Sequence, residues 1–548
     1  MKKNLIPLFT AFIILNLFSC MKKQKADLIL HNGIIYTVDS AFSIAQSFAA
    51  RNGKIVAVGT NNYIFSKFEA EEEIDAGGNS VFPGFIDTHC HFYGYGTNLM
   101  RIDLKGTKSF TEVLQRVKEN QNKKFGGWIW GRGWDQNEWE IKEFPDNRLL
   151  DSLFPDVPVF LQRIDGHAAL GNSKALSLIN RDWSKDIAGG EIIRIDGKPT
   201  GLLVDAAADT VKAAIPPLSL EEKKQALLAA QKDCFAVGLT TVSDAGYSAD
   251  ETIEIFNTIK ELQNNNELLM RIYAMIDWSE QNAEYFFRQG IYKDDRLNIR
   301  SFKLYSDGAL GSRGAFLLEP YIDKPESNGI LLYEIDHLKH ITGQIVKTDF
   351  QLNTHCIGDS AARIMIALYG TALGINNERR WRIEHAQVIH PDDLRKFKDY
   401  RIIPSVQTTH ATSDMGWAEE RLGPERVKNA YAYKKLLQAA GIIANGSDFP
   451  VEDINPLYGF YAAISRKDLK GNPESGFQME NALTREEALR AMTIWAAFAN
   501  FEEDEKGSIE KGKFADFVIL DNDIMTIDQS KIPVTKVTQT YISGKKVF

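Results

Sequence analysis

The sequence contains little cysteine and no excess of positive charge. Only 4 of its 548 residues are cysteine, and 64 lysine and arginine residues are outnumbered by 73 aspartate and glutamate residues, which gives a formal net charge of −9. A nucleic-acid surface requires clustered basic side chains, so we do not expect this chain to bind DNA or RNA. Repeats and low-complexity tracts are also missing, and 44% hydrophobic with 25% charged residues is typical of a folded globular protein.

Long apolar runs are absent except at the start. Residues 1–20, MKKNLIPLFTAFIILNLFSC, place two lysines before an apolar stretch that is too short for a stable bilayer span and has the form of a signal peptide. The ending Leu17-Phe18-Ser19-Cys20 resembles the lipobox of bacterial lipoproteins, which implies cleavage before Cys20 and lipidation of its thiol. We therefore expect an exported protein, held by a lipid anchor to the bacterial cell envelope on the periplasmic side or the surface. The alternative is an ordinary signal peptide with a chance cysteine.

The three remaining cysteines are Cys90, Cys234 and Cys356. In an exported protein, an odd number argues against a full disulfide framework. Cys90 and Cys356 each adjoin a histidine in a stretch with the composition of a strand. We predict that all three cysteines are buried, unpaired thiols.

Short apolar or β-branched runs recur along the chain, and each ends in polar residues. Eight of them are candidate strands: 81–91, 236–246, 269–277, 299–308, 350–359, 380–387, 402–410 and 442–451. Helix-like stretches lie between most of them, for example 251–263, 360–371, 391–399 and 425–440. Strands that alternate with helices indicate parallel βαβ units. Eight units predict an α/β fold with a TIM-like (β/α)₈ barrel over 83–484, whose active site lies at the C-terminal ends of the strands.

The regular alternation of candidate strands and helices is interrupted by one long gap. About 145 residues separate His91 from Ala236, which is too many for one loop and one helix. The gap has strand candidates of its own, and Asp196-Gly197 is a hairpin signal. We interpret 100–230 as a domain inserted after the first strand, over the barrel mouth.

The two ends of the chain both predict short strands. Asn32-Gly33 and Asn52-Gly53 are strong hairpin signals in the N-terminal part. Neither end can bury a core alone. We therefore expect 21–82 and 485–548 to form one composite β-sandwich.

The stretch Gly84–His91, GFIDTHCH, contains three side chains of metal-binding type in a row. Along a strand, residues i and i+2 face the same side and residue i+1 faces the other. His89 and His91 therefore point together into the barrel, and Cys90 points away from it. This spacing can place two imidazoles on one metal ion.

Four more polar residues lie in or at the ends of later candidate strands. His355 and His385 end the fifth and sixth strands, Asp448 ends the eighth, and Lys303 lies in the fourth. Any one of them alone is more often a structural residue, but in a barrel they converge on the same mouth as the histidine pair. Neutral imidazole and carboxylate suit Zn²⁺ and similar divalent ions.

These residues resemble the pattern of the amidohydrolase superfamily of metal-dependent hydrolases. That pattern has a His-x-His after strand one, a lysine or glutamate on strand four, histidines on strands five and six, and an aspartate on strand eight. The sandwich from both termini also fits. PGFIDTHCHF, KLYSDGALGSRGA, RIEHAQ and GSDFPVED, with GRGWDQNEW and RIDGHAALGNSKAL inside the insertion, resemble the N-substituted formamide deformylase-like branch, amidohydrolase family 3.

The resemblance implies a reaction on a small amide-type substrate. Metal-activated water attacks a carbonyl carbon, and Asp448 acts as general base and then general acid while a non-peptide C–N bond breaks. The metal ligands are His89, His91, Lys303, His355, His385 and Asp448. In the family a lysine at this place often carries CO₂ as an N6-carboxylate that bridges two metals, and an unmodified lysine beside one ion is the alternative. Zinc, as one or two ions, is the first candidate.

Substrate contacts are predicted at three further residues. His167 matches a family motif position in the insertion, Arg313 is placed to pair with an anionic substrate group, and His410 lies past strand seven, where it can donate a hydrogen bond to the substrate or the oxyanion. The chain reads Ser-Arg-Gly at 312–314, where related chains usually read Ser-Arg-Thr. A cyclic amidohydrolase or deaminase on the same site, and a non-catalytic lipid-anchored binding protein, stay open as alternatives. The sequence does not indicate an oligomeric state.

Overall fold

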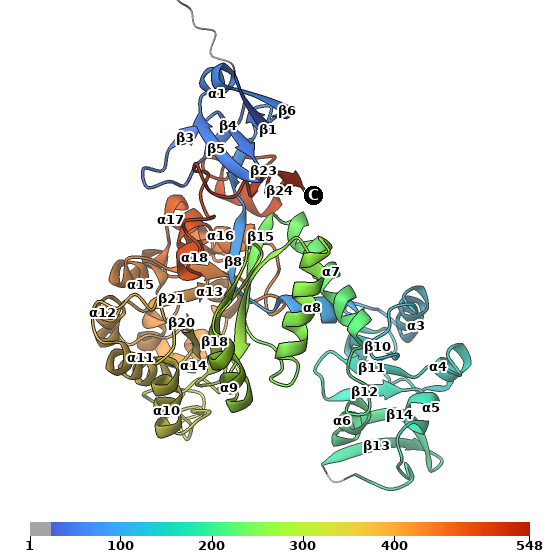
Figure 1. The fold of residues 1–548 in the computed structure, drawn as a ribbon. Helices are drawn as coiled ribbons and strands as arrows, with labels where there is room; N and C mark the ends of the chain where they lie inside the picture. Colours follow the sequence, from blue (N-terminus) through green and yellow to red (C-terminus); the bar gives the residue numbers. More distant parts are fainter. Residues whose placement is uncertain (1–22, 188) are drawn as a thin grey trace, which may run out of the picture.

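The computed structural model describes residues 23–187 and 189–548 (Figure 1). The signal peptide predicted over 1–20, with the lipidation site at Cys20, lies outside the described residues. Within the described ranges, no helix is both long enough and apolar enough to cross a membrane.

Eight parallel strands form the barrel. Their order is β22-β21-β20-β19-β18-β16-β15-β8, and every neighbouring pair is parallel. The strands are β8 (Phe85–Cys90), β15 (Leu239–Asp244), β16 (Arg271–Asp277), β18 (Leu297–Tyr305), β19 (Gln351–Cys356), β20 (Arg382–His385), β21 (Ile403–Gln407) and β22 (Ala444–Gly446). The ring closes where Asp448 N donates to His89 O at 2.7 Å and His91 N donates to Phe449 O at 2.8 Å. All eight predicted strands are confirmed.

Helices alternate with these strands and surround the ring (Figure 1). They are α7 (Leu220–Ala236), α8 (Thr252–Asn264), α9 (Glu280–Gln289), α10 (Ile335–Ile345), α11 (Asp359–Leu373), α12 (Pro391–Asp399), α13 (Thr408–Asp414), α14 (Ala418–Arg426), α15 (Tyr433–Ala440), α16 (Pro456–Ser465), α17 (Arg485–Ala491) and α18 (Ile494–Ala499). The predicted helix 425–440 is interrupted, because the end of α14 and a 3-10 turn occupy 425–429 and α15 begins only at Tyr433. Ala430 is extended and Tyr431 has φ +53°, so α15 cannot begin before this break.

The ends of the chain pack as two sheets, drawn blue and red at the top of Figure 1. One has the order β5-β4-β1-β6 and the other β25-β24-β23-β7-β2-β3. Their elements are β1 (Gln24–His31), β2 (Ile34–Tyr36), β3 (Ile44–Ala45), β4 (Ser47–Arg51), β5 (Lys54–Gly59), α1 (Asn61–Lys67), β6 (Phe68–Asp75), β7 (Ser80–Pro83), β23 (Phe517–Leu520), β24 (Val537–Ile542) and β25 (Lys545–Lys546). Phe48 of one sheet packs against Phe517 of the other in a buried cluster, so both termini share one core.

The two asparagine-glycine turns differ. Asn52 and Gly53 both have positive φ between the paired strands β4 and β5, as the predicted hairpin requires. The prediction for Asn32-Gly33 is wrong, because β1 pairs with β4 and β6 whereas β2 pairs with β3 and β7. Here the chain passes from one sheet to the other. The range predicted for the C-terminal part also differs, since α17 and α18 precede the sandwich strands and α18 packs beside β8 and β22.

A third sheet lies between β8 and β15 in the chain. Its order is β13-β14-β12-β11-β10-β9. Its elements are α2 (Phe92–Leu99), β9 (Ile102–Asp103), α3 (Phe110–Glu119), β10 (Ile129–Trp134), α4 (Arg148–Leu153), β11 (Val159–Arg163), β12 (Ala168–Gly171), α5 (Ser173–Ser177), β13 (Gly190–Ile195), β14 (Lys198–Asp205) and α6 (Ala206–Lys212). The turn at Asp196-Gly197 is the predicted hairpin, with positive φ at both residues.

This inserted unit stands to one side of the barrel in Figure 1, in teal at the lower right, whereas we expected it over the mouth. The predicted range 100–230 also includes most of α7. That helix leads into β15 and packs on α8 and on β15, so it belongs to the barrel. A short strand, β17 (Tyr292–Lys293), pairs with β18, and single 3-10 turns occur at 136–138, 427–429, 479–481 and 529–534.

Candidate metal centre

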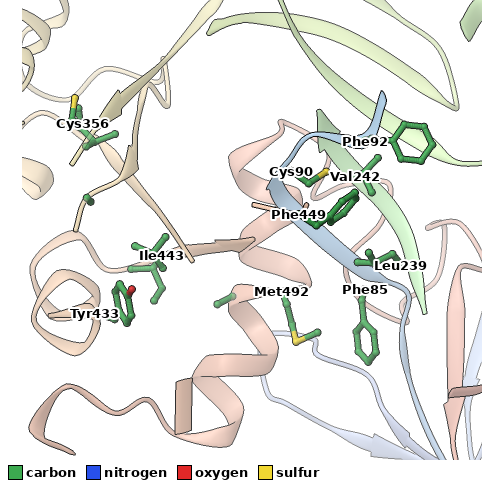
Figure 2. Close-up of a cluster of buried hydrophobic side chains, with 14 of the residues drawn as sticks. Phe85, Cys90, Phe92, Leu239, Val242, Cys356, Tyr433, Ile443, Phe449 and Met492 are labelled. Carbon is green, nitrogen blue, oxygen red and sulfur yellow. The ribbon is translucent and has the colours of Figure 1, made fainter. Parts of the chain in front are cut away.

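The end of β8 presents its residues as the alternation predicts. His89 is fully buried in the ring, and His91 follows at the first turn of α2 with 30% of its side chain exposed. Cys90 faces the other way and lies in the buried cluster with Phe92 and Val242 (Figure 2). The three cysteines after Cys20 are buried and, among the residues that the structure describes, form no disulfide, as predicted.

Two buried carboxylates fix the end of β8. Asp87 accepts hydrogen bonds from His89 N at 3.0 Å and from Ser447 Oγ at 2.6 Å, which ties β8 to the segment after β22. Asp244, at the end of β15, accepts from the backbone N–H groups of Phe92 and Tyr93 at the first turn of α2. The histidine pair is therefore held by neighbouring strands on both sides.

The structure gathers all six predicted ligand residues, which we call the six-residue cluster: His89, His91, Lys303, His355, His385 and Asp448. His89 Nε2 lies 3.1 Å from Lys303 Nζ and 3.8 Å from Asp448 Oδ1, and His91 Nε2 lies 3.1 Å from the same carboxylate oxygen. The His385 ring lies 4.7 Å from that of His89 and 4.5 Å from that of His355, centroid to centroid. The strand ends thus bring together residues up to 359 positions apart in the chain.

The donor atoms fit a divalent metal ion. Ligand atoms of His89, His385 and Asp448 all lie within 4.8 Å of one another. His355 Nε2 is buried and has no hydrogen-bond partner within the described part of the chain. Burial lowers the pKa of His89 to about 4 and that of His355 to about 3, so these imidazoles are neutral, which is the form that binds metal.

Asp448 is ionised despite its burial. Burial by itself would raise its pKa, but the contacts with His91, whose Nε2 lies 3.1 Å from Oδ1, and with the other nearby histidines lower it below the ordinary value. Its backbone has φ +62°, and His385 has φ +71°. Left-handed conformations cost about 1–3 kcal/mol each for residues other than glycine and are kept only where the surroundings impose them. The fold therefore holds both side chains in fixed positions.

Residues behind the cluster orient its imidazoles. Glu384 Oε2 lies 2.5 Å from His89 Nδ1, and Gln407 Oε1 lies 2.7 Å from His385 Nδ1. Because these oxygens accept hydrogen bonds, Nδ1 carries the proton in each ring and Nε2 is left as the ligand atom. Arg382 Nε binds Glu384 Oε1 at 2.6 Å, and both side chains are fully buried.

We did not predict these supporting residues from the sequence. A signal was present, since Arg382 and Glu384 stand at i and i+2 in a short strand, and two opposite charges on one face of a buried strand predict an internal ion pair. That signal would not have shown which histidine the pair contacts.

Of the three residues predicted to contact substrate, one lies beside the six-residue cluster and two are paired with carboxylates elsewhere. His410 is buried beside the cluster, with Nε2 3.8 Å from Asp448 Oδ2 and its ring stacked 6.0 Å from that of His385. Arg313 is not brought to the cluster, because its guanidinium is paired with Asp323 at 2.6 Å. His167 is exposed in the inserted unit and binds Asp205 at 2.8 Å.

Comparison with known proteins identifies the family. Residues 72–548 match the model of the amidohydrolase family. The chain belongs to the amidohydrolase family. It is 34% identical to the protein LONG AFTER FAR-RED 3 of Arabidopsis thaliana over 95% of this chain and 92% of that one, and 26% identical to the N-substituted formamide deformylase of Arthrobacter pascens over 95% and 98%.

A solved structure shares the fold. It is an uncharacterized metal-dependent hydrolase from Pyrococcus furiosus, with a TM-score of 0.77 and 28% identity over 91% of this chain and 100% of that one. Family membership and the cluster together make this protein a hydrolase of the metal-dependent amidohydrolase superfamily.

Proposed function

We propose that this amidohydrolase cleaves a non-peptide C–N bond in a small amide-type molecule, of the amide or formamide kind. The convergence of four imidazoles, one carboxylate and one lysine in the six-residue cluster supports this most. The similarity to an N-substituted formamide deformylase points to the same bond type. A divalent ion, with zinc as first candidate, would activate water and polarise the substrate carbonyl when bound there.

Asp448 is the residue that we assign to proton transfer. It is an ionised, nine-tenths buried carboxylate at the centre of the cluster. A carboxylate in this position accepts a proton from the attacking water and returns it to the leaving amine, as general base and then general acid. Its Oδ1 lies 3.1 Å from His91 Nε2 and has no hydrogen-bond partner in the described part of the chain, so it is free to accept a proton.

His410 is suited to stabilising negative charge on the carbonyl oxygen. Gln387 Nε2 donates to His410 Nδ1 at 3.0 Å, so the ring proton of a neutral His410 lies on Nε2. That nitrogen is buried and has no hydrogen-bond partner among residues 23–187 and 189–548. A buried donor held ready next to the cluster stabilises an oxyanion without reorganisation.

Whether the site holds one metal ion or two depends on whether Lys303 is modified. We propose that its Nζ forms a carbamate with CO₂, releasing one proton, and that the two new oxygens help to hold a second ion. Its burial and its position 3.1 Å from His89 Nε2 support this assignment. Intact mass and metal analysis test it: two ions with a CO₂ adduct are expected, and one ion without an adduct would refute the carbamate.

A substrate panel tests the reaction. Purified protein is assayed on N-acyl amines, formamides, cyclic imides and aminopurines. Turnover of the first two classes is expected, and turnover only of the last two would favour a cyclic amidohydrolase or deaminase. Asp448→Asn should abolish turnover, and Asp323→Asn, in the pair with Arg313 outside the cluster, should not. Bound metal without turnover of any class would favour a non-catalytic binding protein.

We also propose that Cys20 is lipidated and anchors the exported protein to the bacterial cell envelope. The lysines, the apolar run and the lipobox-like ending of residues 1–20 support this. Cys20→Ala should move the protein from the membrane fraction to the soluble fraction. An unchanged distribution would refute the anchor.

A further inference from the structure

A polar cleft separate from the six-residue cluster lies in the inserted unit. It has a volume of about 470 Å³ and is lined by Arg101, Trp130 and Arg132, by His167 and by Lys212 of α6. Arg132 belongs to the motif GRGWDQNEW and His167 to RIDGHAALGNSKAL. Both motifs stood out in the sequence, and neither contributes to the six-residue cluster.

Two buried donors in this cleft have no acceptor. The guanidinium of Arg101 lies over the indole of Trp130, 4.0 Å from the ring centroid. Trp130 is only 5% exposed, and its Nε1 and the Nε of Arg101 are both buried without a hydrogen-bond partner in the described part of the chain. Arg101 makes one side-chain hydrogen bond, from Nη1 to Asn98 Oδ1 at 2.9 Å. Buried donors without partners are costly and mark a place for an acceptor.

The cationic side chains of the cleft are likewise unpaired. Arg101, Arg132 and Lys212 form no ion pair with any residue that the structure describes. Burial, with the charge of Arg132 nearby, lowers the pKa of Arg101 to about 10, which reflects a cation held without a counter-ion.

The acidic side chains of the cleft are mostly neutralised by partners. Asp165 pairs with Arg163, and Asp205 pairs with His167, whose pKa the contact raises. Only Asp209 stands without an ion pair among the described residues. Three unpaired cations therefore face one unpaired carboxylate, and the cleft attracts a negatively charged group.

We propose that this cleft is a binding site for small molecules that carry a carboxylate group. The planar guanidinium of Arg101 matches a planar carboxylate, and Arg132 and Lys212 add positive charge to the same cleft. A single negative charge suits the cleft better than a phosphate dianion, because Asp209 also lines it. The proposal concerns the inserted unit alone and does not depend on the reaction at the barrel.

Calorimetric titration of the full chain with benzoate tests the site. Because the carboxylate of benzoate should accept charge-assisted hydrogen bonds from Arg101, Arg101→Gln should weaken benzoate binding by about 10-fold or more. Arg132 is exposed, so Arg132→Gln should leave the fold intact and weaken benzoate binding by about 2- to 5-fold. Arg148→Gln is the matched control, since Arg148 lies in the same unit but pairs with Asp146 away from the cleft.

The outcomes separate clearly. Binding by the wild type and the control, with losses in the Arg101 and Arg132 variants, supports the site. No benzoate binding by the wild type would overturn it, and so would equal binding by all variants. Inorganic phosphate is titrated in parallel, and binding tighter than that of benzoate would overturn the assignment to carboxylates.

Discussion

Glu384 offers the sharpest test of how this protein holds its metal centre. Its carboxylate is fully buried between two groups, with Oε2 2.5 Å from His89 Nδ1 and Oε1 2.6 Å from Arg382 Nε. Glu384→Gln keeps the shape of the side chain but removes its charge and replaces one acceptor oxygen with a donor NH₂ group. Either His89 or Arg382 then faces a donor instead of an acceptor.

Glu384→Gln should weaken metal binding and also lower the free energy of unfolding. Removing the partner of a metal-binding histidine typically lowers metal affinity about 10- to 100-fold, which corresponds to about 1.4–2.7 kcal/mol. Leaving a buried charge without its partner costs about 3–5 kcal/mol of folding free energy. The lower end applies here, because Arg382 keeps hydrogen bonds to Thr88 O at 2.6 Å and to Asn500 Oδ1 at 3.1 Å.

The assay separates the two effects. Metal affinity is measured by competition with a chelator, and stability by denaturant unfolding of the metal-free protein. Glu502→Gln is the matched control, because Glu502 is a buried carboxylate bound to Lys506 at 3.0 Å and to Asn298 at 3.2 Å. It should lose stability and keep its metal affinity. Unchanged metal affinity in Glu384→Gln, or an equal loss in the control, would refute the orienting role.

Three further perturbations have defined outcomes. Asp516→Asn breaks the buried pair with Arg271 (2.6 Å) between sandwich and barrel, so the unfolding free energy should fall by about 3–5 kcal/mol; unchanged denaturant curves would contradict this. Gly446→Ala would put a Cβ 2.5 Å from His89 N and should abolish metal binding in equilibrium dialysis, whereas Gly343→Ala meets open space and should not. Protein from which a chelator has removed the metal should gain about 2.7 kcal/mol of unfolding free energy when zinc is restored at about 100 times the Kd of the site. A melting temperature that does not rise would argue against a metal site in the folded state.

Much of the barrel was predictable because its signal is local. Each strand is a short apolar run that ends in polar residues, and period-two alternation assigned His89 and His91 to one face and Cys90 to the other. Predictions failed where the partner of a segment decides its geometry. Asn32-Gly33 has the composition of a hairpin, but the edges of β1 are occupied by β4 and β6.

The metal-binding residues of the candidate site could be predicted from the sequence, but the residues that hold them in place could not. Histidine and aspartate at strand ends carry their own chemical signal. Glu384 and Arg382 do not, because buried ion pairs form only when strands far apart in sequence are adjacent. The same reason separates His410, which lies beside Asp448, from His167 and Arg313, which pair with carboxylates elsewhere.

The sequence by itself determined where the barrel strands lie along the chain, the alternation at β8 and the set of metal-binding side chains, because these depend on residue type and short-range spacing. Only the tertiary structure decided which atoms meet. Closure of β22 on β8 places Asp448 against His91, burial makes the imidazoles of His89 and His355 neutral, and the inserted unit carries a cleft of its own. These properties depend on distance and desolvation, which exist only after the chain has folded.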